Sequence, residues 1–318
     1  MSGKGWIITS IILIIGSGIF LLSRLSFRVK KEITVNASLF IVSRQITDLH
    51  NWQKWYPRVK ETDSAFIRYS GNTTQVNATL QCGKRLYTVM RVNPEEINIK
   101  EAAGKKLVYH AVIAVSDQLG VHTRVQWSAT FNFFSWLSEK IHPTGGIDHS
   151  IRSLKEYIET PLLYYGFPIE MQRITDTLLI SKKDTVLMRN APARLEQLFD
   201  DLLLYAHTYR PAIESSRILG VFPVGKDSAE VIANIPVHHK APEKNGIMYL
   251  RMPEGGKIVT TMYKGLYRNI GKAHKALQQY ISDRSLKKIA LSYEKYFTAT
   301  LPVNDSAEVK VQVCYPVF

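Results

Sequence analysis

The second half of the chain contains one sequence pattern twice, and this repeat constrains the fold more than any other feature. Arg189-Asn190 recurs as Arg268-Asn269, and Asp227-Ser228-Ala229-Glu230-Val231 recurs as Asp305-Ser306-Ala307-Glu308-Val309. The two offsets, 79 and 78 residues, agree closely. Because self-similarity at a fixed period is typical of repeated structural modules, the repeat indicates a duplicated unit.

Each copy predicts the same order of elements, namely strand, helix, strand, strand. Alternating and β-branched runs predict the strands, and apolar residues at helical spacing predict the helices. In the first copy the elements are expected at residues 176–187, 195–209, 217–224 and 229–237. In the second copy the strands are expected at 257–263, 291–298 and 308–317, and the helix is expected to follow an N-cap at Asn269. We therefore expect one domain at 175–318, with repeats at about 175–240 and 250–318.

A carboxylate lies among aromatic residues in the predicted strand at 291–298. Alternation places Glu294 and Tyr296 on one face of this strand and Tyr293 and Lys295 on the other. Two interpretations stay open. Glu294 is either a solvated strand residue paired with Lys295 or Arg268, or a group that faces a ligand.

The segment Thr175–Phe318 resembles the GyrI-like, or bacterial effector-binding, domain. The matching segments are the turn Tyr263-Lys264-Gly265-Leu266-Tyr267, the strand Glu294-x-Tyr296 and the closing Val313-Cys314-Tyr315-Pro316-Val317. The resemblance implies two packed modules with a groove for small, often lipophilic and cationic molecules, and a strand carboxylate that faces the ligand. That role falls on Glu294 alone, since the corresponding strand of the first copy, at 218–224, contains no acid.

The candidate ligand-binding residues combine this carboxylate with aromatic rings. Rings offer cation–π faces and the acid offers a charge partner, so such a pocket suits an organic cation. The set is Glu294, Tyr296, Tyr263, Tyr267 and Tyr293. Because Tyr293 and Tyr296 fall on opposite faces, only one of them can share the pocket with Glu294, and alternation favours Tyr296.

Residues 1–31 have the composition of a membrane anchor with a basic flank. Only Arg24 is charged within residues 6–25, and about 20 apolar residues cover the ~30 Å hydrocarbon core. A cleaved signal peptide is the alternative, because Lys4 precedes the apolar run. The basic flank at 28–31 favours an uncleaved single-pass helix, with the soluble domains in the cytoplasm.

Residues 32–160 predict one antiparallel sheet wrapped around a long terminal helix at 148–158. Three segments, Asp48…Asn51-Trp52-x-x-Trp55-x-Pro57, Val125-x-Trp127 and the final Ser153-Leu154-Lys155-Glu156-Tyr157-Ile158-Glu159, resemble the SRPBCC superfamily, the START and polyketide-cyclase-like helix-grip fold. The resemblance covers about 35–160.

The helix-grip resemblance implies a largely apolar cavity for lipids or aromatic metabolites. Trp52 and Trp55 are our candidates for lining this second cavity. The alternative is that these rings, like Trp127, fill the core, since large aromatic residues in a β-rich domain bury much area.

The predicted fold is α+β: an N-terminal transmembrane helix, a helix-grip domain, a linker at 161–174 and a duplicated strand-helix-strand-strand domain. The net charge of +14 permits contact with anionic surfaces, but no DNA-reading module accompanies it, so we expect no direct nucleic-acid partner. Cys82, Cys314 and the scattered histidines lack metal-ligand spacing, and nothing implies a metal or a cofactor.

The favoured function is that of a membrane-anchored protein that binds a small lipophilic molecule. A hydrolase or cyclase that uses Glu294 and a neighbouring tyrosine for acid–base chemistry is the second hypothesis. A ligand-responsive regulator of a partner protein is the third. The spacing reveals no nucleophile, triad or metal site, so binding ranks above catalysis. No signal indicates an oligomeric state.

Overall fold

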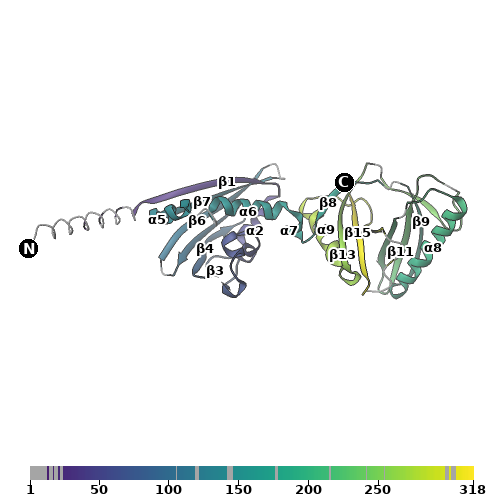
Figure 1. Ribbon diagram of the computed structural model, residues 1–318, viewed down its shortest axis with the longest axis horizontal. Coiled ribbons are helices and arrows are strands. Elements are labelled where there is room, and N and C mark those ends of the chain that lie inside the picture. The colour runs from purple at the N-terminus through teal and green to yellow at the C-terminus, as the bar shows by residue number, and fades with distance from the viewer. Residues whose placement is uncertain are drawn as a thin grey trace, which may run out of the picture. The chain divides into compact units, whose positions relative to one another are not determined.

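The computed structural model describes residues 13, 17, 21, 24–104, 106–118, 122–141, 146–175, 178–214, 216–240, 242–253, 255–297, 301 and 306–318. The chain divides into two compact units, Met1–Thr160 and Pro161–Phe318 (Figure 1). Apart from isolated positions, the expected membrane helix at 6–25 lies outside the described residues. In the part of the chain that is described, no helix is long and apolar enough to cross a membrane.

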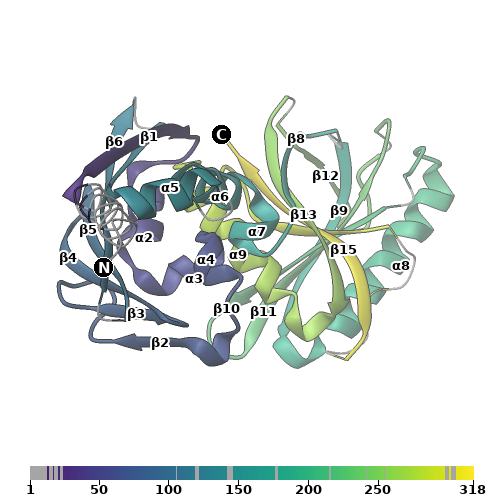
Figure 2. The same cartoon turned by 60° about the vertical axis from the view of Figure 1, so that its left-hand side comes forward.

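The first unit is a seven-stranded antiparallel sheet packed against helices (Figure 2). Its strands, in the order β1-β7-β6-β5-β4-β3-β2, are β1 Ser26–Val35, β2 Ile67–Ser70, β3 Thr79–Cys82, β4 Arg85–Asn93, β5 Glu96–Ala103, β6 Lys106–Gln118 and β7 His122–Asn132. Its helices are α2 Leu39–Thr47, η1 Leu49–Asn51, α3 Trp52–Trp55, α4 Pro57–Lys60, η2 Ser64–Phe66, α5 Phe133–Ile141 and α6 Ile147–Glu159. The predicted sheet and closing helix are confirmed, with α6 against β1 and β7.

Strand β1 begins earlier than predicted. It pairs with β7 from Ser26, opposite Asn132, to Val35, opposite Thr123. Residues 28–31, which were assigned to a membrane flank, therefore lie within a strand. There Arg28 and Lys30 alternate with the partly buried Phe27 and Val29, and Lys31 lies 3.9 Å from Asp148 of α6. The sheet therefore begins six residues before the predicted domain boundary at residue 32, because exposed basic residues of a strand can have the same composition as a membrane flank.

The motif around Trp52 closes the C-terminal end of α2. The last carbonyls of a helix have no partner within the helix, and here side chains supply the missing donors. Asn51 Nδ2 donates to Arg44 O over 3.0 Å, Trp55 Nε1 to Gln45 O over 3.0 Å, and Trp52 Nε1 to Ile46 O over 2.9 Å. The three side chains of the motif thus donate hydrogen bonds to three successive backbone carbonyls at the end of α2.

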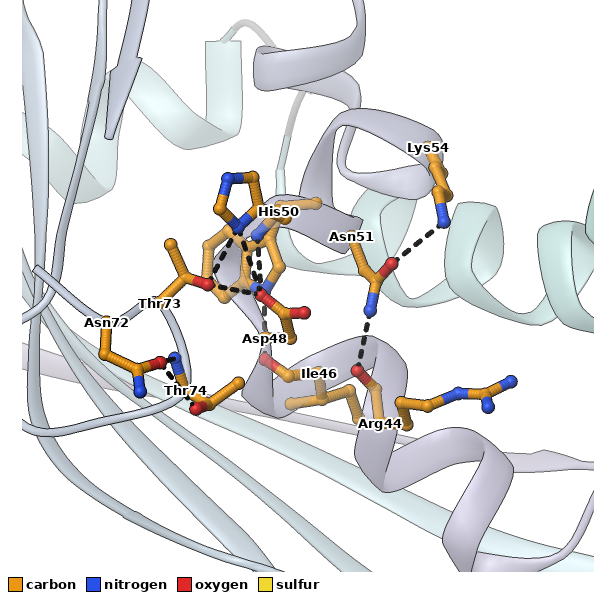
Figure 3. A network of polar contacts seen from close by, with 10 residues as sticks. Arg44, Ile46, Asp48, His50, Asn51, Lys54, Asn72, Thr73 and Thr74 are labelled. Atoms are coloured by element: carbon orange, nitrogen blue, oxygen red, sulfur yellow. Dashed lines mark hydrogen bonds and ion pairs between the residues drawn. The ribbon is translucent and has the colours of Figure 1, made fainter. Parts of the chain in front are cut away.

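Asp48 begins this turn and ties it to a neighbouring loop. Its Oδ1 accepts from the His50 backbone N–H over 3.0 Å and from the Thr73 hydroxyl over 2.8 Å (Figure 3). His50 Nδ1 lies 2.8 Å from Thr73 Oγ1, and the His50 ring stacks on Tyr69 at 4.2 Å between centroids. The acid therefore caps η1 rather than serving as an isolated surface charge.

Trp52 and Trp55 lie in the core of the first unit. Each is only 1% exposed, and they pack with Tyr56, Tyr87 and Trp127 in a continuous aromatic cluster. Tyr56 stacks on Trp127 with centroids 5.7 Å apart. The structure therefore favours the core interpretation of Trp52 and Trp55 over their role as lining of a second cavity.

We expect Trp52→Phe to lower the free energy of unfolding by about 2–3 kcal/mol, because it leaves Ile46 O without its donor and opens space in the cluster. Urea unfolding followed by circular dichroism measures this loss. The matched control is Trp136→Phe on α5, a half-buried indole that stacks on Phe27. Equal losses in the two variants would contradict the capping role.

The second unit is one eight-stranded antiparallel sheet, in the order β12-β9-β11-β10-β14-β15-β13-β8. Its strands are β8 Ile169–Arg173, β9 Leu178–Leu187, β10 Arg217–Val224, β11 Ser228–Pro236, β12 Met248–Arg251, β13 Lys257–Leu266, β14 Tyr293–Tyr296 and β15 Glu308–Val317. Its helices are α7 Pro161–Tyr165, η3 Met188–Asn190, α8 Ala191–Tyr209, η4 Tyr267–Asn269 and α9 Gly271–Asp283. The order strand, helix, strand, strand occurs twice, as the repeat predicted.

The two modules match in detail. Helix α8 packs on β9 and β11, and α9 packs on β13 and β15, as Figure 1 shows. In each module the first N–H of the 3₁₀ helix donates to the segment before the last strand: Met188 N to Asp227 O over 2.8 Å, and Tyr267 N to Ala307 O over 2.9 Å. Each acceptor comes directly before the last strand of its module, but the two are not equivalent in the repeated sequence, in which Asp227 corresponds to Asp305.

Residues 161–174 do not form the predicted linker. They contain α7 and β8, and β8 pairs with the edge of β13 from Lys257 to Thr261. Prolines and a glycine interrupt this segment, and its five-residue strand is stabilised by pairing that local sequence does not reveal. Strand β12 was missed for the same reason. The predicted N-cap of the second helix is also corrected, since Asn269 ends η4 and Ile270 caps α9.

Candidate functional site

Glu294 lies at the centre of the second sheet. Strand β14 is flanked by β10 and β15, which place Leu219 and Val313 on either side of Glu294. The residue is only 8% exposed. The interpretation of Glu294 as a solvated acid paired with Lys295 or Arg268 is therefore wrong, and its partners come from helix α9 and from its own strand.

Four side chains form a polar network that ends on the Glu294 carboxylate. Tyr296 donates its hydroxyl to Oε2 over 2.8 Å, and His274 Nε2 lies 3.3 Å from Oε1. On the other side of the imidazole, Nδ1 lies 3.0 Å from the Tyr315 hydroxyl, which accepts from Gln278 Nε2 over 3.0 Å. The network spans β14, β15 and α9.

The donor and acceptor of each hydrogen bond in this network can be assigned in turn, beginning at Glu294. Because an ionised carboxylate can only accept hydrogen bonds, His274 Nε2 must carry a proton to donate to Glu294 Oε1. In a neutral imidazole Nδ1 is then an acceptor, so the Tyr315 hydroxyl donates to Nδ1 and accepts from Gln278 Nε2. Each carboxylate oxygen thus accepts one hydrogen bond, and each donor can be electrically neutral.

The electrostatic consequence is a buried carboxylate without a strong cationic partner. Within the described residues, no lysine or arginine nitrogen lies within 4.0 Å of Glu294, and His274 is its ion-pair partner only when protonated. A buried charge held by neutral donors is more costly than one paired with a guanidinium. Such a site favours an arriving cation or hydrogen-bond donor.

A second buried carboxylate, Glu101 on β5, shows the contrast. It is 0% exposed, and its Oε1 accepts from Arg85 and lies 3.6 Å from Arg58 Nη1. Two guanidinium groups already neutralise this acid. Glu101 therefore belongs to a structural ion-pair cluster with Arg58 and Arg85, which the sequence analysis did not predict.

Burial raises the pKa of the Tyr296 hydroxyl far above its ordinary value, and the nearby Glu294 and Tyr267 raise it further. The residue is 1% exposed. Tyr296 consequently keeps its proton at neutral pH and acts as a donor to Glu294. Alternation along β14 correctly predicted that these two side chains share a face.

The other candidate tyrosines have different environments. Tyr263 is buried, and its hydroxyl donates to Leu266 O over 2.7 Å. A β-carbon at Gly265 would lie 2.9 Å from that hydroxyl, so glycine is required for this contact. Tyr267 is half-buried against the core cluster that contains Tyr263 and Tyr296. Tyr293 belongs to a separate cluster on the opposite face of the sheet.

The sequence analysis missed His274, Gln278 and Tyr315. A usable signal existed, because His274 and Gln278 are four residues apart and share one face of a helix. Their partner Tyr315 lies in the closing motif of the GyrI-like resemblance. In the described residues no group of three or more His, Cys, Asp or Glu side chains is placed to hold a metal ion.

We expect Tyr296 to make the protein less stable in alkali. A tyrosine in the unfolded chain ionises near pH 10, whereas folded Tyr296 stays neutral, so its contribution is complete below about pH 10 and is lost as the pH rises above it. The slope from one such group is about 1.4 kcal/mol per pH unit. Urea unfolding between pH 9 and 11 should therefore show a shallower decline for Tyr296→Phe than for wild type. Identical slopes would contradict the assignment.

Comparison with protein families finds a match for the first unit. A family model described as "Polyketide cyclase / dehydrase and lipid transport" matches residues 26–159. The predicted SRPBCC resemblance is thereby confirmed, and the match begins where β1 begins. A search of curated proteins found no match.

Solved structures of low similarity also align with the chain. The crystal structure of the EcmrR C-terminal domain has 15% identity and a TM-score of 0.37, with 48% of this chain and 98% of that chain covered. A protein from Nitrosospira multiformis has 17% identity and a TM-score of 0.36, covering 42% and 97%. CalU16 from Micromonospora echinospora has 15% identity and a TM-score of 0.32, covering 42% and 74%. Scores this low support no statement on function.

Proposed function

We propose that this protein binds small lipophilic molecules, and that the second unit takes up a cationic one at Glu294. The observation that carries the proposal is the buried carboxylate, which neutral donors hold within the described structure. A cation would supply the missing charge, and tyrosine rings such as Tyr267 and Tyr296 would supply cation–π faces.

The match of residues 26–159 supports small-molecule binding by the first unit as well, because the matched family is described by cyclase, dehydrase and lipid transport activities. The ligand of that unit is apolar in this proposal. The packed Trp52 and Trp55 cluster would form part of its frame rather than its contact surface.

Catalysis is the second candidate, and one observation favours it. One oxygen of Glu294 accepts a hydrogen bond from the protonated hydroxyl of Tyr296, and the other lies beside the imidazole of His274. This combination of groups can perform general acid–base chemistry. In that case Glu294 would act as the base and Tyr296 as the acid on a bound ester or related substrate.

The test is a titration of the full-length chain with a naphthyltrimethylammonium cation and with its neutral isostere, tert-butylnaphthalene. Loss of the charge interaction in Glu294→Gln should weaken cation binding about 10- to 100-fold, equivalent to about 1.4–2.7 kcal/mol, and leave the neutral compound unaffected. The matched control is Glu308→Gln, an exposed acid on β15.

Two results would speak against cation binding. Equal affinity for the charged and neutral compounds would show that the carboxylate does not contribute to binding. If Glu308→Gln weakened cation binding as much as Glu294→Gln does, the effect would come from the net surface charge. Turnover of naphthyl acetate that disappears in both Glu294→Gln and Tyr296→Phe would instead favour the hydrolase.

We further propose that residues 6–25 anchor the protein in a membrane, with both units in the cytoplasm. The apolar composition of that segment supports the proposal. In cell fractionation, the full chain should resist extraction from membranes by carbonate, and removal of residues 1–24 should release it. Release of the full chain by carbonate would refute the anchor.

A further inference from the structure

A cavity of about 400 Å³ lies on the face of the second sheet opposite to Glu294. Ile218 on β10 and Asn234 on β11 are register partners that line it, as are Gly220 and Ile232. The neighbouring Leu219, which pairs with Glu294, points to the other face because strand residues alternate. This cavity is therefore separate from the polar network described above.

Asn234, one of the residues that line the cavity, has a buried polar atom without a hydrogen-bond partner among the described residues. Asn234 is 6% exposed, and its Nδ2 donates to Ile218 O over 3.3 Å, which fixes the orientation of the amide. Among the described residues, Oδ1 has no hydrogen-bond partner. A buried acceptor without a donor is costly, so a donor from a ligand would be stabilised here.

The shape of the cavity depends on Gly220. A β-carbon at this position would lie 2.4 Å from the Phe222 ring, so the ring occupies the place of a side chain at 220. Ile218 and Tyr293, which also line the cavity, belong to a small buried cluster with Leu179 and Cys314. The floor is thus formed by packed residues rather than by mobile surface side chains.

The remaining lining is largely apolar and includes Leu250, Met252, Pro253, Leu291 and Pro316, with Ser292 as a further polar residue. Among the described residues the lining contains no acid, and its one charged residue is Arg251. A single cation in the wall disfavours a cationic ligand, in contrast to the Glu294 site. The volume is at the lower end of the ~300–1,000 Å³ typical of ligand pockets, which fits a compact molecule.

We propose that this cavity is a second binding site of the second unit, for a neutral apolar molecule that carries one hydroxyl or N–H donor. The apolar body lies between Leu250, Leu291 and Tyr293, and the donor binds Asn234 Oδ1. This site operates independently of the proposed cation site, because the two lie on opposite faces of the sheet.

The test uses 1-naphthol as the donor-bearing probe and naphthalene as its donor-free analogue, titrated into the full-length chain and followed by probe fluorescence. Asn234→Leu removes the acceptor at similar side-chain volume and should weaken naphthol binding about tenfold, with less than a twofold effect on naphthalene. Leu291→Asp places an acid at an exposed position of the lining and should weaken both probes.

Glu308→Gln, which removes an exposed acid of β15 that belongs to neither site, is the matched control and should leave naphthol affinity unchanged. Thermal unfolding of each variant establishes that it folds, and Leu291→Asp keeps the test valid should Asn234→Leu not fold. The proposal is overturned if naphthol does not bind saturably, if both cavity variants bind it as wild type does, or if Glu308→Gln alone weakens it. None of these results depends on whether a cation binds at Glu294.

Discussion

Pairing between β10 and β14 joins the two copies of the repeat into one sheet, and both candidate sites depend on its register. In the described part of the chain, three residue pairs form this junction: Arg217 with Tyr296, Ile218 with Lys295, and Leu219 with Glu294. A slip of one residue would exchange the faces of β14 and carry Glu294 away from α9. The same register directs Tyr293 and Ile218 into the apolar cavity on the other face. Two chemically different surfaces are therefore consequences of one short antiparallel contact.

The two buried carboxylates illustrate how the environment of a charge separates structure from function. Glu101 lies between two arginines that compensate its charge through Oε1, while its Oε2 has no hydrogen-bond partner among the described residues. Glu294 has the imidazole of His274 and the hydroxyl of Tyr296, which are groups that can donate a hydrogen bond without carrying charge. Because burial of an uncompensated charge is costly, the proposed cationic ligand would compensate the charge of Glu294, whereas two arginines already do so at Glu101.

Large parts of the fold were predictable because they depend on local patterns. Alternation placed Glu294 with Tyr296 and apart from Tyr293, and the repeat predicted both modules of the second unit. The failures involve elements stabilised by distant partners. Strand β8 exists through its pairing with β13, and the beginning of β1 exists through its pairing with β7. The tryptophans were correctly recognised as part of a motif, but their donors serve the carbonyls of α2, a role that only the three-dimensional arrangement reveals.

The sequence by itself determined the periodicities: two strand-helix-strand-strand modules, the helix-grip pattern of the first unit, and which residues share a face of each strand. These follow from backbone geometry, which repeats every two residues in a strand and every 3.6 in a helix. Only the tertiary structure decided which face meets which partner. It brought His274 from α9 and Tyr315 from β15 to Glu294, and it left Asn234 Oδ1 buried beside an apolar cavity. Such encounters depend on packing between residues far apart in the chain, for which a single sequence carries no local signal.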